Sequence, residues 1–382
     1  MSEAQPSSLY IHIPFCRAKC HYCDFNSYPG LEALYEPYVA AVIAELAQWV
    51  EEWPELEWQT IYIGGGTPSV LAPEQMARLL AGCGTSWRVA ESAEITQEAN
   101  PGTMDSAQLV ALRRLGITRL SLGVQSLDDG LLRLLGRIHT AQEAVDTFRL
   151  ARQAGYDNIN LDLMYGLPGQ SLAQWQETLR TALALRPDHL SLYALTLHEE
   201  TPLAQQIACG ALPAPDDDMA AEMYTWARHE LQAQGWLHYE LSNWAARPES
   251  ICRHNLTYWL DQPYLGIGAG AHSYVGRRRF WNVNQPDVYI QRITVGERPV
   301  AGAEQIDAAT EMAEMMMLGL RLIEGVSYRR FRQRFGCDLR EIYATELDAL
   351  TRYDLIHVEP ERVRLTERGY LLGNEVFERF LP

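Results

Sequence analysis

Short runs of β-branched and aromatic residues recur along the first two thirds of the chain and predict β-strands. The runs begin at residues 9, 60, 93, 118, 158, 189 and 237. Segments with apolar residues at helical spacing follow most of them, and the clearest of these begin at residues 34, 106, 141 and 172. Two of the helices should end where "RRLG" and "RQAG" supply a basic last turn and a glycine. The pattern is therefore an alternation of strand and helix.

This alternation predicts a parallel sheet, because each parallel strand needs a right-handed crossover connection. About six strand–helix units are enough to curl such a sheet into a partial barrel. We therefore expect an α/β fold in which residues 1–245 form a partial (β/α)6 barrel. In a barrel of this kind ligands gather at the C-terminal ends of the strands.

The rhythm breaks after about residue 245, where aromatic and glycine-rich sequence predicts a connecting region over residues 246–303. Residues 304–382 are predicted to form a mostly helical C-terminal domain. Its end reads as helix, turn, helix and two short strands around "PER", which is the outline of a winged helix. A packing or docking role is favoured over DNA binding, because "YRRFRQR" has no second basic segment to accompany it.

Composition and charge narrow the class of protein. The 382 residues are 47% hydrophobic and 21% charged, which is typical of a globular chain. The formal net charge of −17 argues against nucleic acid as a partner, because phosphate binding depends on lysine and arginine. The N-terminus lacks the pattern of a signal peptide, and no apolar stretch reaches the length of a membrane span, so a cytoplasmic location is expected.

Three cysteines follow the first predicted strand closely: Cys16, Cys20 and Cys23 in "FCRAKCHYC". The total of seven cysteines is odd, which argues against a disulfide framework and favours a thiolate metal site. A structural zinc site needs a fourth ligand, which His12 or His21 could supply. An iron–sulfur cubane fits better, because three thiolates can hold three of its irons and leave the fourth open to another ligand.

Polar residues also stand at the ends of the next predicted strands. The glycine run in "GGGTPS" would let backbone groups approach a polar ligand, although a tight turn also accounts for it. Glu98, Gln125 and Asp162 each lie within apolar strand sequence, so they should pair with one another or face a polar ligand. Arg137 is a natural partner for a carboxylate, either that of Asp162 or that of the ligand.

Together these motifs resemble the oxygen-independent coproporphyrinogen III oxidase family of radical S-adenosylmethionine (SAM) proteins. The resemblance covers most of the chain and rests on "YIHIPFCRAKCHYC", "GGGTPS", "QEANP", "SLGVQS", "LGRIH" and "DLMYGLPGQ". It implies a 4Fe–4S cluster bound by Cys16, Cys20 and Cys23, with SAM on the open iron. It also implies a cofactor site formed by Tyr10, Tyr22, Gly65, Gly66, Thr67, Glu98, Gln125, Arg137, Asp162 and Thr196.

One departure from the oxidase pattern selects a branch of this family. The oxidase has a fourth cysteine where "CDFNS" has Phe25, which argues against decarboxylation of coproporphyrinogen III. The variant, together with "CRHNLTYW", is similar to the heme-chaperone branch, whose H-N-x-x-Y-W motif is linked to heme binding. Here that motif is His254, Asn255, Tyr258 and Trp259. His254 is the expected axial ligand, because heme iron accepts a neutral imidazole.

Alternatives for the iron ligand are Cys252 and His272, and His254 could instead be a histidine held by hydrogen bonds within a loop. The favoured hypothesis is a heme chaperone that carries heme, a 4Fe–4S cluster and SAM. Its expected partners are apo-hemoproteins and an electron donor such as a flavodoxin. Respiratory acceptors would bring it near a membrane, although no segment predicts an anchor. The competing hypotheses are a radical SAM enzyme acting on a porphyrinogen and a zinc protein with a nucleic-acid module, which the net charge argues against.

Overall fold

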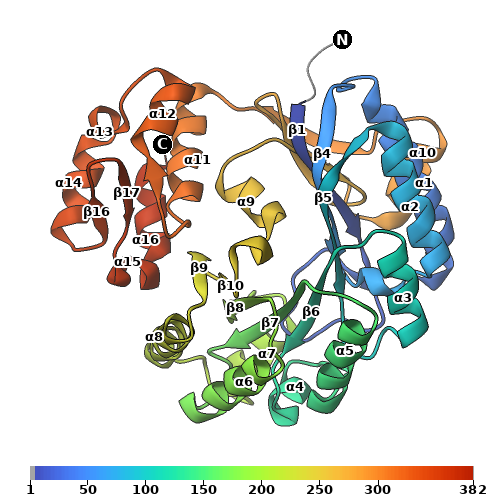
Figure 1. The fold of residues 1–382 in the computed structure, drawn as a ribbon, viewed down its shortest axis with the longest axis horizontal. Coiled ribbons are helices and arrows are strands. Elements are labelled where there is room, and N and C mark those ends of the chain that lie inside the picture. The colour runs from blue at the N-terminus through green and yellow to red at the C-terminus, as the bar shows by residue number, and fades with distance from the viewer. Residues whose placement is uncertain (1–4, 382) are drawn as a thin grey trace.

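The computed structural model describes residues 5–381 and is built around one twelve-stranded sheet (Figure 1). Its strand order is β14-β13-β12-β11-β1-β4-β5-β6-β7-β8-β10-β9. Six strands run parallel in the order of the sequence and form the predicted partial barrel. They are β1 (Gln5–Ile13), β4 (Leu56–Gly65), β5 (Arg88–Ala99), β6 (Arg119–Gln125), β7 (Ile159–Tyr165) and β8 (His189–Ala194).

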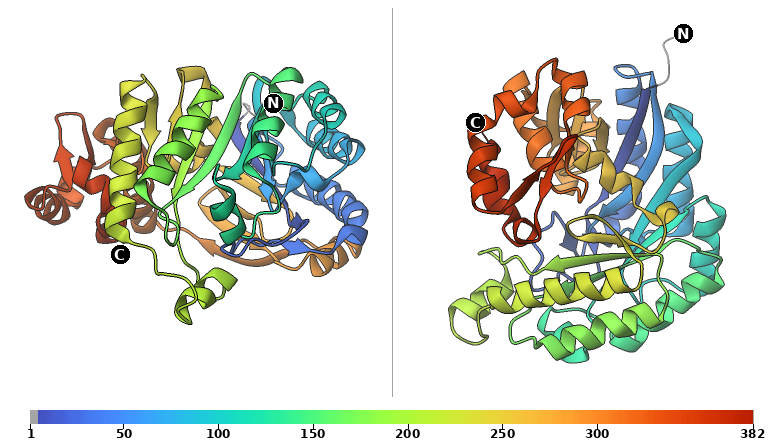
Figure 2. Two further views of the ribbon diagram at one scale, coloured as in Figure 1. Left: turned by 90° about the horizontal axis from the view of Figure 1, so that it is seen from below. Right: turned by 60° about the vertical axis from the view of Figure 1, so that its left-hand side comes forward.

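Helices cover the outer face of the barrel strands (Figures 1 and 2). The helices predicted from residues 34, 106, 141 and 172 are confirmed, and three of the four begin at a side-chain cap formed by Asp105, Thr140 or Ser171. Buried tryptophans such as Trp49, Trp58 and Trp175 fill the main hydrophobic core. The helices of this region are α1 (Tyr35–Val50), α2 (Pro73–Ser86), α3 (Ser106–Arg114), α4 (Asp129–Leu134), α5 (Ala141–Gln153), α6 (Leu172–Ala184), α7 (Pro202–Ala208) and α8 (Asp217–Ala233).

The prediction of a single strand from residue 237 is wrong. The segment folds into two short antiparallel strands, β9 (Leu237–Glu240) and β10 (Asn243–Ala245). Glu240 lies at the turn between them and accepts a hydrogen bond from the backbone N–H of Ser242 at 3.2 Å. Because β10 pairs antiparallel with β8, the parallel part of the sheet ends at β8 on this side.

The segment expected as a connecting region, residues 246–303, extends the same sheet on its other side. Strand β11 pairs with β1 in parallel, and the three strands after it are antiparallel. The buried carboxylate of Glu45 on α1 ties this region to the barrel, because it accepts hydrogen bonds from Tyr289 and Asn282. The elements are α9 (Arg253–Trp259), β11 (Tyr264–Ile267), β12 (His272–Val275), β13 (Arg278–Asn282), α10 (Pro286–Thr294) and β14 (Val300–Gln305).

The C-terminal domain has the predicted helix–turn–helix and two-stranded outline, with its own hydrophobic core and a third short strand. An ion pair of 2.8 Å between Arg334 and Asp261 joins it to the segment after α9. Figure 2 shows this domain packed to one side of the barrel. Within residues 5–381, none of the helices combines the length and apolar character of a membrane span. The domain's elements are α11 (Ala308–Gly319), β15 (Val326–Ser327), α12 (Tyr328–Phe335), α13 (Leu339–Ile342), α14 (Ala344–Arg352), β16 (Ile356–Val358), β17 (Arg362–Leu365), α15 (Glu367–Leu371) and α16 (Gly373–Phe377).

Candidate cluster and cofactor site

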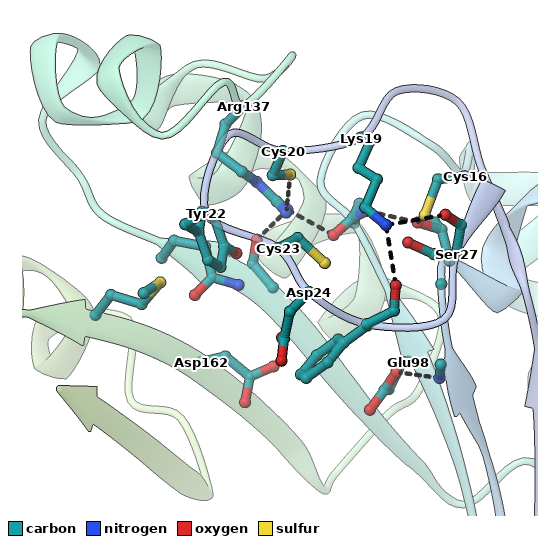
Figure 3. A pocket seen from close by; sticks show the side chains of 18 of the residues that line it. Cys16, Lys19, Cys20, Tyr22, Cys23, Asp24, Ser27, Glu98, Arg137 and Asp162 are labelled. Carbon is teal, nitrogen blue, oxygen red and sulfur yellow. Dashed lines mark hydrogen bonds between the residues drawn. The ribbon is translucent and has the colours of Figure 1, made fainter. Parts of the chain in front are cut away.

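The three cysteines lie on one loop that leaves the C-terminal end of β1. Its base is closed by a two-stranded pairing of β2 (Phe15–Cys16) with β3 (Tyr28–Pro29). Cys16 is buried, whereas Cys20 and Cys23 are half-buried at the wall of a cavity. Figure 3 shows the three side chains directed toward this cavity from the loop. The predicted strand and the cysteine spacing after it thus place three thiols around one cavity mouth.

Two donors contact the sulfurs, one from the segment after β4 and one from the loop after α4. The Thr67 hydroxyl donates to Cys16 Sγ at 3.3 Å, and Nη1 of Arg137 donates to Cys20 Sγ at 3.3 Å. Burial raises the pKa of the Cys16 thiol, and the Thr67 hydrogen bond lowers it in part. A guanidinium beside one sulfur and a hydroxyl beside another both favour thiolate over thiol. Cys16 and Cys20 thus each accept a hydrogen bond of the kind that tunes the sulfur ligands of an iron–sulfur cluster.

The two histidines that could have completed a zinc site, His12 and His21, make hydrogen bonds to groups other than the cysteines. His12 contacts the Tyr10 hydroxyl through Nδ1 and the carbonyl of Asn26 through Nε2, both at 2.8 Å. His21 Nδ1 lies 3.1 Å from the carbonyl of Leu134. In the part of the chain that the structure describes, no three His, Cys, Asp or Glu side chains converge to hold one metal ion. A cubane does not require such convergence, because each cysteine binds a separate iron.

Lys19 fixes the conformation of the cysteine loop, and sequence reasoning missed it. Its ammonium donates to the carbonyls of Phe25 at 3.1 Å and Ser27 at 3.3 Å, which closes the loop from within (Figure 3). Lys19 is the single lysine among 382 residues, whereas arginine supplies every other side chain of that charge class. The single lysine was therefore the feature of the sequence that could have indicated a special role for position 19, because an ammonium is more compact than a guanidinium.

The cavity has a volume of about 380 Å³ and opens between the cysteine loop and the C-terminal ends of β4 to β8. Most of the residues predicted for the site line it. These are Cys16, Cys20, Tyr22, Cys23, Gly65, Gly66, Thr67, Glu98, Gln125, Arg137, Asp162 and Thr196.

The glycines at the end of β4 are required by close packing against the first strand. Ile13 pairs with Gly65 across the parallel strands. A Cβ on Gly65, whose φ is +113°, would lie 2.5 Å from the His12 ring, and one on Gly66 would lie 2.6 Å from the carbonyl oxygen of Phe15. Only glycine lets these two segments of the backbone approach so closely and leaves backbone groups facing the cavity.

Two carboxylates line the cavity, that of Glu98 near the end of β5 and that of Asp162 in the middle of β7. Glu98 accepts hydrogen bonds from the Tyr62 hydroxyl at 2.7 Å and from the N–H of Gly65 at 3.0 Å. Burial raises the pKa of Glu98 to about 7 despite these bonds, and the charge of Asp162 adds to the shift. Burial likewise raises the pKa of Asp162. Both carboxylates lose hydration on burial, and a bound cation would replace it. This wall of the cavity is therefore suited to a cationic group.

Of the two carboxylate partners predicted for Arg137, that of Asp162 or that of a ligand, the described chain shows no contact with Asp162. Its Nη2 donates to Asn100 Oδ1 at 2.5 Å and to the carbonyl of Gly123 at 2.6 Å. Within the described chain it forms no ion pair with Asp162, which instead accepts hydrogen bonds from Ser121 and Asn160. Asn100, which sequence reasoning did not single out, connects Arg137 to Thr67 and so positions both donors to the cysteines.

Gln125 lines the same wall in an unusual backbone conformation. Its φ is +64°, and the pairing between β6 and β7 is irregular between residues 122 and 125. A left-handed residue within a bulge redirects the side chain at the end of a strand. The conformation is consistent with a residue that is held for binding, since it costs free energy that regular strand geometry would avoid.

Tyr10 and His254 lie beneath the cavity, in the interior of the barrel. Tyr10 stacks on Tyr62 with 6.2 Å between ring centroids. His254 is 1% exposed, and both ring nitrogens are engaged: Nδ1 lies 2.7 Å from the Thr60 hydroxyl and Nε2 lies 3.0 Å from the Tyr258 hydroxyl. In this arrangement His254 has the hydrogen-bonded character that the sequence left open as the alternative to a heme ligand.

The loop after β8 brings a further pair of polar groups to the cavity mouth. Nε2 of His198 lies 3.2 Å from Oδ2 of Asp24, which directly follows the third cysteine. Both residues line the cavity beside Thr196. Sequence reasoning missed this pair, because nothing in the local pattern indicates that residues 24 and 198 meet.

Two family models match the chain. The Radical SAM superfamily matches residues 10–182, and the HemN C-terminal domain matches residues 306–372.

Curated relatives match over nearly the full length. The chain is 39% identical to the heme chaperone HemW of Bacillus subtilis, covering 98% of this chain and 99% of that protein. It is 37% identical to the heme chaperone HemW of Escherichia coli, with complete coverage of both chains. It is also 33% identical to the mitochondrial radical S-adenosyl methionine domain-containing protein 1 of Bos taurus, covering 97% of this chain and 82% of that one.

Among solved structures, the coproporphyrinogen III oxidase HemN of Escherichia coli, a radical SAM enzyme, has the same fold. The TM-score is 0.87 at 23% identity, and the match covers 99% of this chain and 90% of that one.

Proposed function

The chain belongs to the HemW family of radical SAM proteins, and on that premise we propose that it is a heme chaperone. In this proposal it binds heme and a 4Fe–4S cluster with SAM, and it passes the heme to apo-hemoproteins. The observation that carries the proposal is the full-length similarity to proteins named heme chaperones. The phenylalanine at position 25, in place of a fourth cysteine, supports the same branch of the family.

We assign the cluster to Cys16, Cys20 and Cys23, whose sulfurs surround one cavity mouth. The open iron would be left for SAM, because the three thiols of the loop are the cysteines that line the cavity. When bound, the cluster would supply a single electron to the sulfonium of SAM. Arg137 and Thr67 hold the sulfurs through hydrogen bonds, and Lys19 keeps the loop closed around them.

The SAM site in this proposal uses the strand ends beside the loop. The ammonium group of SAM would be bound by Glu98 and by the backbone at Gly65 and Gly66, where no Cβ blocks the approach. Asp162 and Gln125 would bind the polar part of the nucleoside, because they line the same cavity from the neighbouring strands β7 and β6. The capacity of Glu98 to take up a proton near pH 7 makes this binding sensitive to pH.

The proposal is tested by adding hemin to the anaerobically reconstituted protein and recording the Soret band. We expect the Soret absorbance to saturate at a defined ratio of hemin to protein. A second measurement follows coproporphyrinogen III in the presence of SAM and a reductant. Accumulation of protoporphyrinogen without stable heme binding would overturn the proposal in favour of the enzyme alternative.

The proposed partners are apo-hemoproteins as acceptors and a low-potential electron donor such as a flavodoxin. The prediction that His254 ligates heme requires helix α9 to move, because the imidazole is buried between Thr60 and Tyr258. A hemin titration of His254→Gln tests that prediction alongside the wild type.

A further inference from the structure

A second, shallow hollow adjoins the cofactor cavity at the cysteine loop. Its volume of about 10 Å³ is enough for about one water molecule. A single layer of side chains separates the hollow from the cavity, because the same residues line both: Ala18, Cys20, Thr67, Asn100 and Arg137. Figure 3 shows Cys20 and Arg137 of this layer, joined by the hydrogen bond to the sulfur. A partner that covers the hollow therefore comes close to Cys20 without entering the cofactor cavity.

The rim of the hollow combines an apolar side chain with an arginine. Ile138 is 60% exposed, and Arg17 is exposed beside the same hollow. Neither residue lines the cofactor cavity. Nη2 of Arg17 donates to the carbonyl of Thr103 at 3.3 Å, which holds the guanidinium at the rim. Exposed apolar groups and arginine are both typical of protein–protein contacts.

The segments that contribute to the hollow are basic, although the chain as a whole is acidic. They are residues 14–23, 64–73, 99–104 and 130–142, and they contain no Asp or Glu. The whole chain has 49 acidic and 32 basic residues. A basic surface of this kind favours an acidic partner, because complementary charge speeds and orients association. The cations of the four segments are Arg17, Lys19, Arg133 and Arg137.

Neutral groups engage three of these cations. Arg17 and Lys19 donate to backbone carbonyls, and Arg137 donates to a carbonyl, an amide oxygen and a thiol. Asp129 and Glu143, which adjoin the last of the four segments in the sequence, accept hydrogen bonds from backbone N–H groups at the start of α5. The positive charge at the cysteine loop thus remains available to a partner.

We propose that an acidic flavoprotein of the flavodoxin class docks over this hollow and reduces the cluster through the layer that contains Cys20. This inference rests on the proposed function, in which SAM fills the cofactor cavity and an electron donor is required. Because electron transfer slows steeply with distance, the donor has to approach the cluster from a face that SAM leaves free. At the hollow, the exposed edge of a flavin ring can pack on Ile138 while acidic side chains around it face Arg17.

The step transfers one electron and no atom. The reduced flavin of the donor loses one electron, the oxidised cluster gains it, and no proton passes between the two proteins. Arg17 and Ile138 act by holding the donor, so they are positioning residues. Their loss should change how fast the donor reduces the cluster but not whether the cluster forms.

The test uses the full-length, cluster-reconstituted protein and a purified flavodoxin. Stopped-flow absorbance measures the rate at which reduced flavodoxin reduces the cluster, and calorimetric titration with oxidised flavodoxin measures binding. At low ionic strength Arg17→Glu should lower the second-order rate constant and the affinity by about tenfold, and added salt should narrow the difference. Ile138→Ser should lower both by about threefold at any ionic strength, because it removes an apolar contact and no charge.

The matched control is Arg329→Glu, which makes the same change of charge at an exposed position of α12 and should react as the wild type does. Dithionite needs no docking surface and should reduce the cluster fully in every variant. Wild-type rates in both Arg17→Glu and Ile138→Ser would overturn the inference, and so would an equal loss in Arg329→Glu. A change of oligomeric state in the two rim variants, measured by sedimentation, would overturn it in favour of a contact between copies of the chain. A wild type without a cluster that dithionite can reduce would instead overturn the proposed function.

Discussion

In the proposed SAM site, Glu98 makes cofactor binding depend on pH. Its carboxylate must be ionised to bind the ammonium group of SAM, and burial raises its pKa from 4.5 to about 7. The ionised fraction of a group with that pKa rises from about a tenth at pH 6 to about nine tenths at pH 8. The apparent affinity for SAM should therefore rise by about tenfold between these two values, which corresponds to about 1.4 kcal/mol.

The affinity for SAM should rise with pH, because the pKa of Glu98 is raised by burial. An acid with a raised pKa stays protonated across the range where a free carboxylate is already charged, so binding is gained as the pH rises through about 7. Glu98→Gln removes the titrating group and should lower the affinity at pH 8 while flattening the dependence on pH. The amino group of SAM also titrates in this range, but it does so equally for both proteins.

The assay is equilibrium dialysis of labelled SAM at pH 6, 7 and 8 at constant ionic strength. Glu222→Gln, which changes an exposed glutamate of α8, is the control for the loss of one negative charge. The quantity compared is the difference in slope between wild type and Glu98→Gln. Equal slopes would refute the assignment of Glu98 to the ammonium group, whatever the absolute affinities are.

Three further predictions concern the loop, the cluster and the scaffold. Lys19→Met should lower the iron bound after reconstitution, because two hydrogen bonds worth about 0.5–1.5 kcal/mol each no longer close the loop, whereas normal iron content would show that the loop closes without the ammonium. Cys20→Ser should abolish the visible charge-transfer absorption of the cluster, and an unchanged spectrum with bound zinc would end the cluster assignment. Tyr289→Phe should lower the free energy of unfolding in urea by about 1–3 kcal/mol, because the buried Glu45 carboxylate loses a 2.6 Å hydrogen bond, and a change within error would contradict this.

The order of strands and helices could be predicted because each barrel strand is buried and each helix has one apolar face. The pattern was ambiguous at residues 237–245, where one apolar run contains a turn at Leu241 and Ser242. The alternation of large side chains continues through that turn, so periodicity alone does not separate one strand from a hairpin. The sheet extension by β11 to β14 was also not predicted, because its short strands carry no distinctive period.

The cavity residues could be predicted where chemistry and strand position agreed. Glu98 and Asp162 are charged residues within apolar strands. Because the strands of a barrel end at one face, both side chains could be expected to line the same cavity. His198 and Asp24 were missed because two loops bring them together only in the folded chain. The buried, hydrogen-bonded position of His254 could also not be predicted, because its partner Thr60 lies 194 residues away in the sequence.

The proposed function requires an iron site that the polypeptide leaves open for SAM. The most direct test is the EPR spectrum of the reduced, reconstituted protein before and after SAM is added. We predict the signal of a single reduced 4Fe–4S cluster whose g values change when SAM binds. A cluster spectrum that SAM does not alter, or a protein that takes up no cluster, would contradict the account.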